Sequence, residues 1–156
     1  MSFLPLHAWL DGLLEAVWLV EEKSLCILHA NKAAEQLAGM PGSDMAGKPV
    51  TSLATTPQDQ AFWAEPMATL AVGIHSHSNV LRADGVLVPV ERRVTRVNPG
   101  DGSAVLMLTM LDRSAQEATE QELETLLSEL RATLDSAADG MLVCGLDGRV
   151  RAFNQR

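Results

Sequence analysis

Apolar residues near the start of the chain recur first at helical spacing and then in short runs typical of strands. Leu6, Leu10, Leu13, Leu14 and Val17 are spaced for one helical face, and this predicts an amphipathic helix within residues 1–15. Residues 16–20 and 25–30 form two apolar runs joined by a charged turn, which predicts a pair of strands. Asn31 is the expected N-cap of a following helix that ends at Gly39.

The middle of the chain predicts one more helix and three long strands. Residues 57–71 carry apolar side chains at Phe62, Trp63, Met67 and Leu70, and this spacing predicts a helix. Residues 74–82, 86–97 and 103–111 predict strands, because the segments between them, 84–85 and 98–102, are rich in glycine and polar residues typical of hairpin turns. Two opening strands and three closing strands separated by helices predict an α+β domain with one antiparallel sheet.

A heptad pattern begins after residue 114. Leucines follow one another in steps of four and three residues at Leu123, Leu127, Leu130 and Leu134, which is the spacing of a coiled-coil seam. We therefore expect residues 114–138 to form a linker helix. Its leucine seam, together with the N-terminal apolar helix, should pair with a second copy of the chain and make a homodimer.

The end of the chain repeats its beginning. The apolar run 17–20 corresponds to residues 141–144 at an offset of 124, and Asn31 corresponds to Asn154 at an offset of 123. Internal repeats indicate modular architecture. Residues 139–156 are thus predicted to open a second module, and the chain is expected to be a piece of a longer protein.

The order and spacing of four segments resemble the PAS family of sensory domains. These segments are ILHANKAAEQLAG, GMPGSDMAGKPVTSL, LRADGVLVPVERRV and VLMLTMLDRS. The resemblance implies a five-stranded antiparallel sheet around a small pocket, flanked by helices. It divides the chain into an N-terminal amphipathic helix (1–15), a sensory domain (16–113), a signalling linker helix (114–138) and the start of a second PAS domain (139–156).

The resemblance also implies a function. We expect a non-catalytic sensory and dimerisation module of a bacterial signalling protein, a sensor histidine kinase of a two-component phosphorelay. A small molecule or a partner would act on the sheet, and the linker helix would pass that signal to an output domain. The alternatives are a module of a cyclic-dinucleotide synthase or hydrolase, a transcription regulator, or a ligand-free dimerisation scaffold.

The composition of the chain limits the classes of partner and the cellular location that we expect. A net charge of −8 disfavours binding to a phosphate backbone, so no nucleic acid partner is expected. No stretch approaches the roughly 20 apolar residues of a membrane span, and the start lacks the basic region of a secretory signal. Cys26 and Cys144 have no metal-ligand spacing, and two reduced, packed thiols fit a cytoplasmic protein.

Motifs for catalysis or cofactors are missing from the sequence. It has no nucleophile elbow, no P-loop and no dinucleotide-binding glycine pattern, so the chain itself is not expected to be an enzyme. His75 and His77 share a strand face and are weak metal candidates, but a polar outer face is the preferred interpretation. The resemblance also disfavours haem and flavin. Haem-binding PAS domains usually take the axial histidine from the long helix, and the helix expected at 57–71 contains none. Light-sensing members place a photoreactive cysteine in the segment that corresponds to residues 39–49, which has no cysteine.

A candidate ligand pocket combines apolar residues with one charge: Trp18, Trp63, Met67, Val88, Val90 and Arg92. Arg92 shares a strand face with Val88 and Val90, and a buried guanidinium needs a carboxylate, solvent or an anionic ligand. We prefer a position that turns Arg92 toward water, and the functional alternative is an anchor for a small carboxylate ligand. The resemblance further makes Asp112, Arg113 and Ser114 the junction that transfers the signal from sheet to helix.

Overall fold

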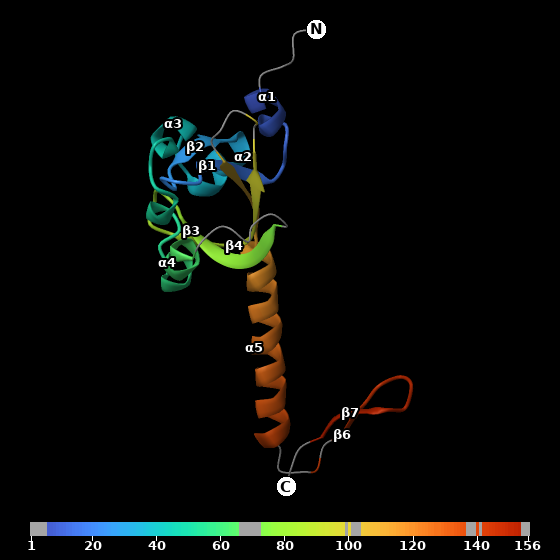
Figure 1. The fold of residues 1–156 in the computed structure, drawn as a ribbon. Helices are drawn as coiled ribbons and strands as arrows, with labels where there is room; N and C mark the ends of the chain where they lie inside the picture. Colours follow the sequence, from blue (N-terminus) through green and yellow to red (C-terminus); the bar gives the residue numbers. More distant parts are fainter. Residues whose placement is uncertain are drawn as a thin grey trace. The chain divides into compact units, whose positions relative to one another are not determined.

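The computed structural model describes residues 6–65, 73–98, 100, 104–136, 140 and 142–153. The chain divides into two compact units, Met1–Ser114 and Ala115–Arg156 (Figure 1). The helices of the first unit are α1 (Leu6–Asp11), α2 (Lys32–Ala38), α3 (Gly42–Met45), the 3-10 turn η1 (Val50–Ser52) and α4 (Pro57–Ala64). Its strands are β1 (Ala16–Glu21), β2 (Ile27–Ala30), β3 (Ile74–Leu81), β4 (Leu87–Val97) and β5 (Val105–Asp112).

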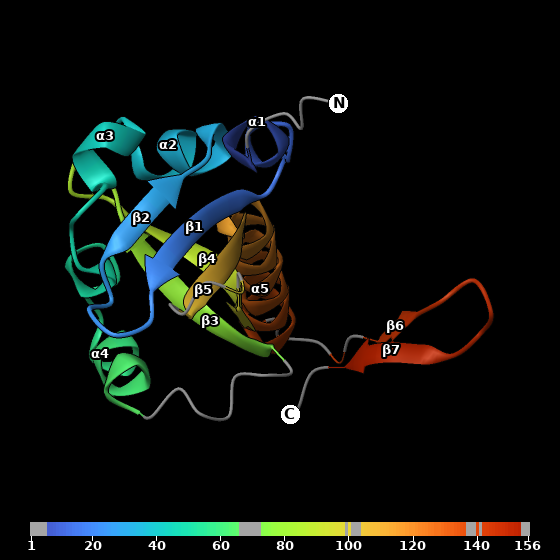
Figure 2. The same cartoon turned by 45° about the horizontal axis from the view of Figure 1, so that its top comes forward.

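The five strands of the first unit form one antiparallel sheet in the order β2-β1-β5-β4-β3. Strand β5 lies at the centre and pairs with both β1 and β4, so Leu108 lies opposite Trp18 on one side and Val94 on the other. Helices α2, α3 and α4 cover one face of this sheet (Figure 2). The predicted α+β fold with a five-stranded antiparallel sheet is confirmed.

Alternation along the strands explains which face is covered. The burial of β4 and β5 repeats every second residue, which is the period of a strand with one face in the core. The buried side of the sheet packs against α2 and α4 through Trp18, Val20, Val80, Val88, Val90, Val94, Leu106, Leu108 and Met110.

Asn31 ties three elements together at one corner of the sheet. Its side chain is fully buried, and its carbonyl oxygen accepts hydrogen bonds from the backbone N–H of Ala34 (3.0 Å) and Val17 (2.8 Å). Its amide nitrogen donates to the backbone oxygens of Leu10 (2.8 Å) and Glu15 (2.9 Å). The predicted N-cap is confirmed, and the same side chain also holds the end of α1 and the start of β1.

Two of the predicted elements are shorter in the structure. Helix α1 ends at Asp11, where the backbone closes a turn from Gly12 to Trp9, and Leu14 is fully exposed instead of lying on a helical face. Strand β2 starts at Ile27 because Leu25 has a left-handed backbone (φ 55°) that no strand accepts. Cys26 forms an isolated β-bridge with Pro49 directly before β2 and is half-buried, so it is not a packed residue of the strand as expected.

The predicted helix at 57–71 also extends too far. Helix α4 begins after its N-cap Thr56 and ends at Ala64, and Glu65 already has an extended backbone. The physical reason is Pro66 in the sequence, because a residue before proline is pushed out of the helical region. Met67 and Leu70, which were expected on this helix, lie outside the described residues.

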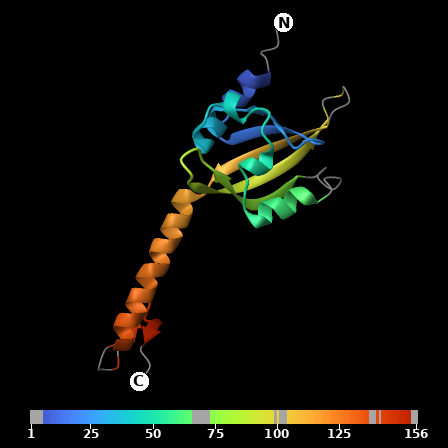
Figure 3. The same ribbon diagram turned by 90° about the vertical axis from the view of Figure 1, so that its left-hand side faces the viewer.

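The second unit contains one long helix and a hairpin. Helix α5 (Ser114–Ser136) is unbroken (Figure 3), and β6 (Leu142–Cys144) pairs with β7 (Val150–Phe153) in an antiparallel two-stranded sheet. The hairpin leaves Leu142, Val150 and Phe153 exposed, and Cys144 is also exposed instead of packed as expected.

Candidate functional site

A charged pair lies in the core of the first unit. Arg92 of β4 and Asp59 of α4 are 2% and 1% exposed, and the guanidinium Nη1 lies 3.0 Å from the Asp59 Oδ1. Arg92 faces the core because, at every second position, it shares the inner side of β4 with Val90 and Val94. Asp59 reaches it from the first turn of α4, so the pair joins a helix to the sheet.

Hydroxyl groups complete the hydrogen bonds of both charges. The Ser78 and Thr56 hydroxyls donate to Asp59 Oδ1 and Oδ2, both at 2.6 Å. The Arg92 Nε and Nη2 donate to the Ser76 hydroxyl oxygen at 3.2 and 3.1 Å. A buried ion pair is tolerated when its remaining donors and acceptors are satisfied in this way.

Two aromatic rings of α4 pack around the guanidinium. The Arg92 Cζ lies 4.2 Å from the centroid of Phe62 and 5.3 Å from that of Trp63, both within cation–π range. The two rings meet edge to face with centroids 5.0 Å apart. The space beside Arg92 is therefore filled by side chains of the protein itself.

Burial shifts the titration of the guanidinium. Desolvation lowers the pKa of Arg92 below its ordinary value, while the attraction and hydrogen bond of Asp59 act in the opposite direction. An arginine still carries its charge at neutral pH. The positive charge thus remains in the core and is neutralised by Asp59.

The preferred interpretation of Arg92 as a water-facing residue is wrong. The guanidinium is buried, and its partner is a carboxylate of the chain, so an anionic ligand is not needed to satisfy it. Sequence reasoning missed Asp59 because an acidic residue in the first turn of a helix is usually a capping charge. The available signal was the spacing of Thr56 and Asp59, the first and fourth residues of a capping box, beside a strand with an inward-facing arginine.

The other candidate pocket residues lie in the same core. Trp18, Trp63, Val88 and Val90 are buried on the inner side of the sheet or against it, and Met67 lies outside the described residues. The indole N–H groups of Trp18 and Trp63 are buried without a hydrogen-bond partner in the described part of the chain. The structure thus brings four of the expected residues together around a packed interior.

The two candidate metal-ligating histidines lie on the opposite side of the sheet. His75 and His77 are exposed on β3, and their cross-strand neighbours on β4 are Arg93 and Glu91. Within the described ranges, no group of three or more histidine, cysteine or acidic side chains is placed to hold a metal ion. No helix in the same ranges is long and apolar enough to span a bilayer.

The expected sheet-to-helix junction forms a compact set of contacts. The Asp112 carboxylate accepts a hydrogen bond from the backbone N–H of Ser114 at 2.8 Å, at the first residue of α5. Arg113 is held on β4 twice, by its backbone N–H to the Pro89 oxygen (2.9 Å) and by its guanidinium to Glu91 (3.1 Å).

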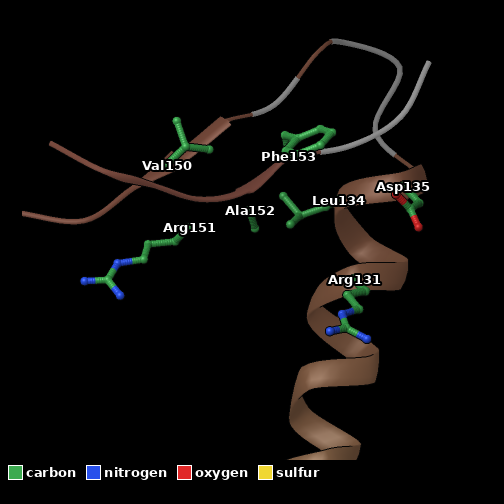
Figure 4. Close-up of a pocket in the computed structure, with 7 residues that line it drawn as sticks. All are labelled: Arg131, Leu134, Asp135, Val150, Arg151, Ala152 and Phe153. Atoms are coloured by element: carbon green, nitrogen blue, oxygen red, sulfur yellow. The ribbon is translucent and has the colours of Figure 1, made fainter.

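The leucines of the expected seam do not share one environment. Leu123, Leu127 and Leu130 are 58%, 47% and 49% exposed, whereas Leu134 is 6% exposed. Leu134 lies beside Ala152 and Phe153 of β7, where the two elements line a hollow of about 370 Å³ (Figure 4). The exposed part of the seam therefore ends at Leu130.

Comparison with known proteins identifies the fold. A family model described as a PAS domain matches residues 14–130. Among curated proteins, none is similar enough in sequence to count as a relative.

Solved structures with the same fold include several signalling domains. The PAS domain of a two-component sensor histidine kinase is 13% identical, with 68% of this chain and 91% of that chain covered at a TM-score of 0.58. The PAS domain of nitrogen regulation protein NR(II) from Vibrio parahaemolyticus is 20% identical, covering 70% and 99% at 0.58. An RNA-binding light-oxygen-voltage receptor is 20% identical, with 82% of this chain and 40% of that chain covered at a TM-score of 0.62. At these identities the similarity shows the shared fold.

Proposed function

This chain belongs to the PAS domain family, and from that premise we propose that it is the sensory and dimerisation module of a bacterial sensor histidine kinase. A small molecule or a protein partner acts on the first unit, and α5 passes the signal to an output domain. PAS domains are generally non-catalytic sensory modules, and one of the solved structures with this fold is the PAS domain of a two-component sensor histidine kinase. In this proposal the module works in the cytoplasm and is non-catalytic.

The observation that carries this proposal is the direct connection between the centre of the sheet and α5. Strand β5 pairs with β1 and β4 along its length and then continues through Arg113 into the helix. Asp112 bonds to the first residue of α5, and Arg113 is anchored to β4 at Pro89 and Glu91. A change in sheet geometry would therefore reach Ser114, the first residue of α5, and signalling further requires that the helix can adopt two arrangements.

Dimerisation is proposed to use the exposed leucines of α5. Leu123, Leu127 and Leu130 are about half exposed, and heptad spacing places them on one stripe. Burying one leucine contributes about 1.5–3 kcal/mol, so three layers exceed the smallest estimates, about 4 kcal/mol, of the association cost.

The hairpin of the second unit is proposed to be the start of a second PAS domain. Its register shifts between Val143 and Cys144, as β1 shifts between Leu19 and Val20 at the equivalent place. Its turn closes with a bond from Gly145 N–H to the Arg149 oxygen (2.7 Å), which matches the bond from Glu21 to Cys26 (2.9 Å). Both turns also contain a residue with a left-handed backbone at the equivalent place, Gly148 in the hairpin and Leu25 in the first unit. Sequence repeat and backbone geometry thus agree.

A ligand-free scaffold is the second candidate, and the filled core favours it. Asp59 neutralises Arg92, and Phe62 and Trp63 occupy the space where a ligand was expected. A small anionic ligand at Arg92 would have to displace Asp59. The indole N–H groups of Trp18 and Trp63 have no acceptor among the described residues, and this favours the sensor, because a bound acceptor would satisfy them.

Native mass spectrometry of the full chain separates the two candidates. The sensor proposal expects a dimer that carries a bound small molecule, identified by its added mass and by extraction. A dimer without added mass favours the scaffold, and a monomer contradicts dimerisation in either form. The coding sequence downstream tests the output domain, where a cyclic-dinucleotide enzyme or a transcription regulator would replace the kinase.

A further inference from the structure

A hollow of about 270 Å³ lies at one end of the sheet in the first unit, lined from α2, the start of β1 and the end of β5. We call it the α2 hollow. Its walls are largely apolar: Leu37 and Met110 are 8% and 3% exposed, whereas Leu14 and Leu111 are 100% and 53% exposed. Pockets that hold drug-sized ligands have about 300–1,000 Å³, so this hollow is of a size for a smaller molecule.

Arg82 lines the same hollow with a positive charge that the chain matches poorly. Its Nε lies 3.6 Å from the Asp84 carboxylate, which is longer than a hydrogen bond, and no described residue accepts a hydrogen bond from this guanidinium. An exposed pair of this kind is weak. By contrast, Arg92 is neutralised in the core, and Arg96 and Arg113 lie 2.8 and 3.1 Å from their carboxylates.

The backbone fixes the place of this charge. Arg82 follows β3 directly, and its backbone N–H donates to the Val86 oxygen at 2.9 Å. The next N–H, of Ala83, donates to the Ala38 oxygen at 2.9 Å, which ties the turn to the end of α2. The guanidinium packs against Gly39, where an added Cβ would lie 3.5 Å from Nη2. The arginine is therefore held at the hollow, and binding needs little further ordering of this side chain.

We propose that the α2 hollow binds a small carboxylic acid with an apolar body, with its carboxylate on Arg82 and its body along Leu14 and Leu111. A guanidinium can bind a carboxylate through two parallel N–H donors. The body would remove apolar surface of the two leucines from water, which is favourable. Neither Arg92 nor Asp59 lines this hollow, so binding leaves their ion pair intact. The inference requires neither a dimer nor an output domain.

Asp112 also lines the hollow, and it makes an amine the competing class of ligand. Its carboxylate would repel a bound acid and attract an ammonium group. This carboxylate is exposed and already accepts a hydrogen bond from the Ser114 N–H at 2.8 Å, whereas the guanidinium of Arg82 has no such bond. The balance therefore favours the acid. A ligand in the hollow would lie beside the residue that bonds to the start of α5.

Nuclear magnetic resonance of the full chain, with three probes of equal chain length, tests the proposal. Hexanoate should shift the backbone amides of Leu111 and Asp112 and the Nε–H signal of Arg82 to saturation, with a dissociation constant of about 1 mM. 1-Hexanol lacks the charge and should bind at least about tenfold more weakly, because a charge-assisted hydrogen bond is lost. Hexylammonium should cause no saturable shift. Acetate, which lacks the apolar body, should bind at least about tenfold more weakly than hexanoate.

Variants at Arg82 identify the charge that is recognised. Arg82→Gln should weaken hexanoate binding at least about tenfold, whereas Arg82→Lys keeps the charge and should weaken it less. The matched control is Arg96→Gln, which removes an exposed arginine of the same sheet outside the hollow and should leave the affinity unchanged within about twofold. If Arg82→Gln does not fold, the comparison of hexanoate with 1-hexanol in the native chain still decides.

Three results would overturn the inference. Hexanoate could cause no saturable shift in the native chain, 1-hexanol or hexylammonium could bind as tightly as hexanoate, or a folded Arg82→Gln variant could keep the native affinity. Tighter binding of hexylammonium would assign the hollow to amines through Asp112 instead.

Discussion

Removing the carboxylate of Asp59 should destabilise the first unit strongly. Asp59→Asn keeps the shape of the side chain and an oxygen that can accept from Thr56, so the change isolates the charge. Arg92 is 2% exposed and would be left buried with no counter-charge. Breaking a buried ion pair in this way costs about 3–5 kcal/mol. Such a loss is a large part of the 5–15 kcal/mol by which domains are usually stable.

Urea unfolding followed by tryptophan fluorescence measures this loss in the full chain. The three tryptophans, Trp9, Trp18 and Trp63, all belong to the first unit, so the signal reports on that unit alone. With a urea dependence of about 2 kcal/mol per molar, the midpoint should fall by about 1.5–2.5 M. Asp44→Asn, an exposed first-turn acid of α3, is the control and should change stability by less than about 0.5 kcal/mol.

A double-mutant cycle shows whether Arg92 causes the loss. Arg92→Met alone should also destabilise, because it leaves the Asp59 charge buried with only hydroxyl donors. Asp59→Asn, Arg92→Met should recover part of the loss, since neither charge remains. Strictly additive effects, or an Asp59→Asn variant as stable as the native chain, would mean that the guanidinium lies in water and that the reasoning is wrong.

Three further outcomes are expected. Asn31→Ala should lower the free energy of unfolding by about 3 kcal/mol or more, because it removes a cap and leaves buried backbone groups of Leu10 and Val17 unpaired, whereas the exposed Gln36→Ala should change it little. The double variant Leu127→Glu, Leu130→Glu should be monomeric in light scattering. The double variant Thr125→Glu, Ser128→Glu adds the same charge on the outer side of α5 and should remain dimeric. If both variants are dimeric, the interface lies elsewhere. Gly148→Ala should reduce the hairpin population seen by NMR, because φ is 73° there and alanine is strained, and Gly140→Ala should not; equal hairpin signals would remove this support for the repeat.

Much of the sheet could be predicted from the sequence because local signals agreed there. Glycine and polar turns separate β3 from β4 and β4 from β5, and alternation along β4 identified its inner face, including Arg92. Asn31 was recognisable both as an N-cap and as part of the internal repeat. The strand and the helix that its side chain joins, β1 and α2, were both predicted. Boundaries were missed where one backbone residue decides them, as at Leu25 and at Glu65 before Pro66.

The candidate site was predicted only in part because its charge partner is distant in sequence. Asp59 and Arg92 are 33 residues apart in the sequence. The periodicity of apolar residues predicts which side of each helix or strand faces the core, but it does not predict which residues of two elements contact each other. The same limit applies to Leu134, which the heptad pattern assigned to the seam but whose side chain is buried beside Ala152 and Phe153. Local patterns thus predicted faces, and tertiary packing decided what each face contacts.

The proposed function requires that a change in the first unit, such as the loss of the Asp59 carboxylate, reaches α5. Asp59→Ala leaves Arg92 without a carboxylate, and acetate can supply one, so acetate should raise the stability of this variant and leave the native chain unaffected. Hydrogen exchange of the backbone amides in α5 (Ser114–Ser136) then tests the claim directly, with and without acetate. The account predicts that acetate slows exchange in the first turns of α5 in Asp59→Ala and has no such effect on the native chain. Restored stability of the first unit with unchanged exchange in α5 would contradict it.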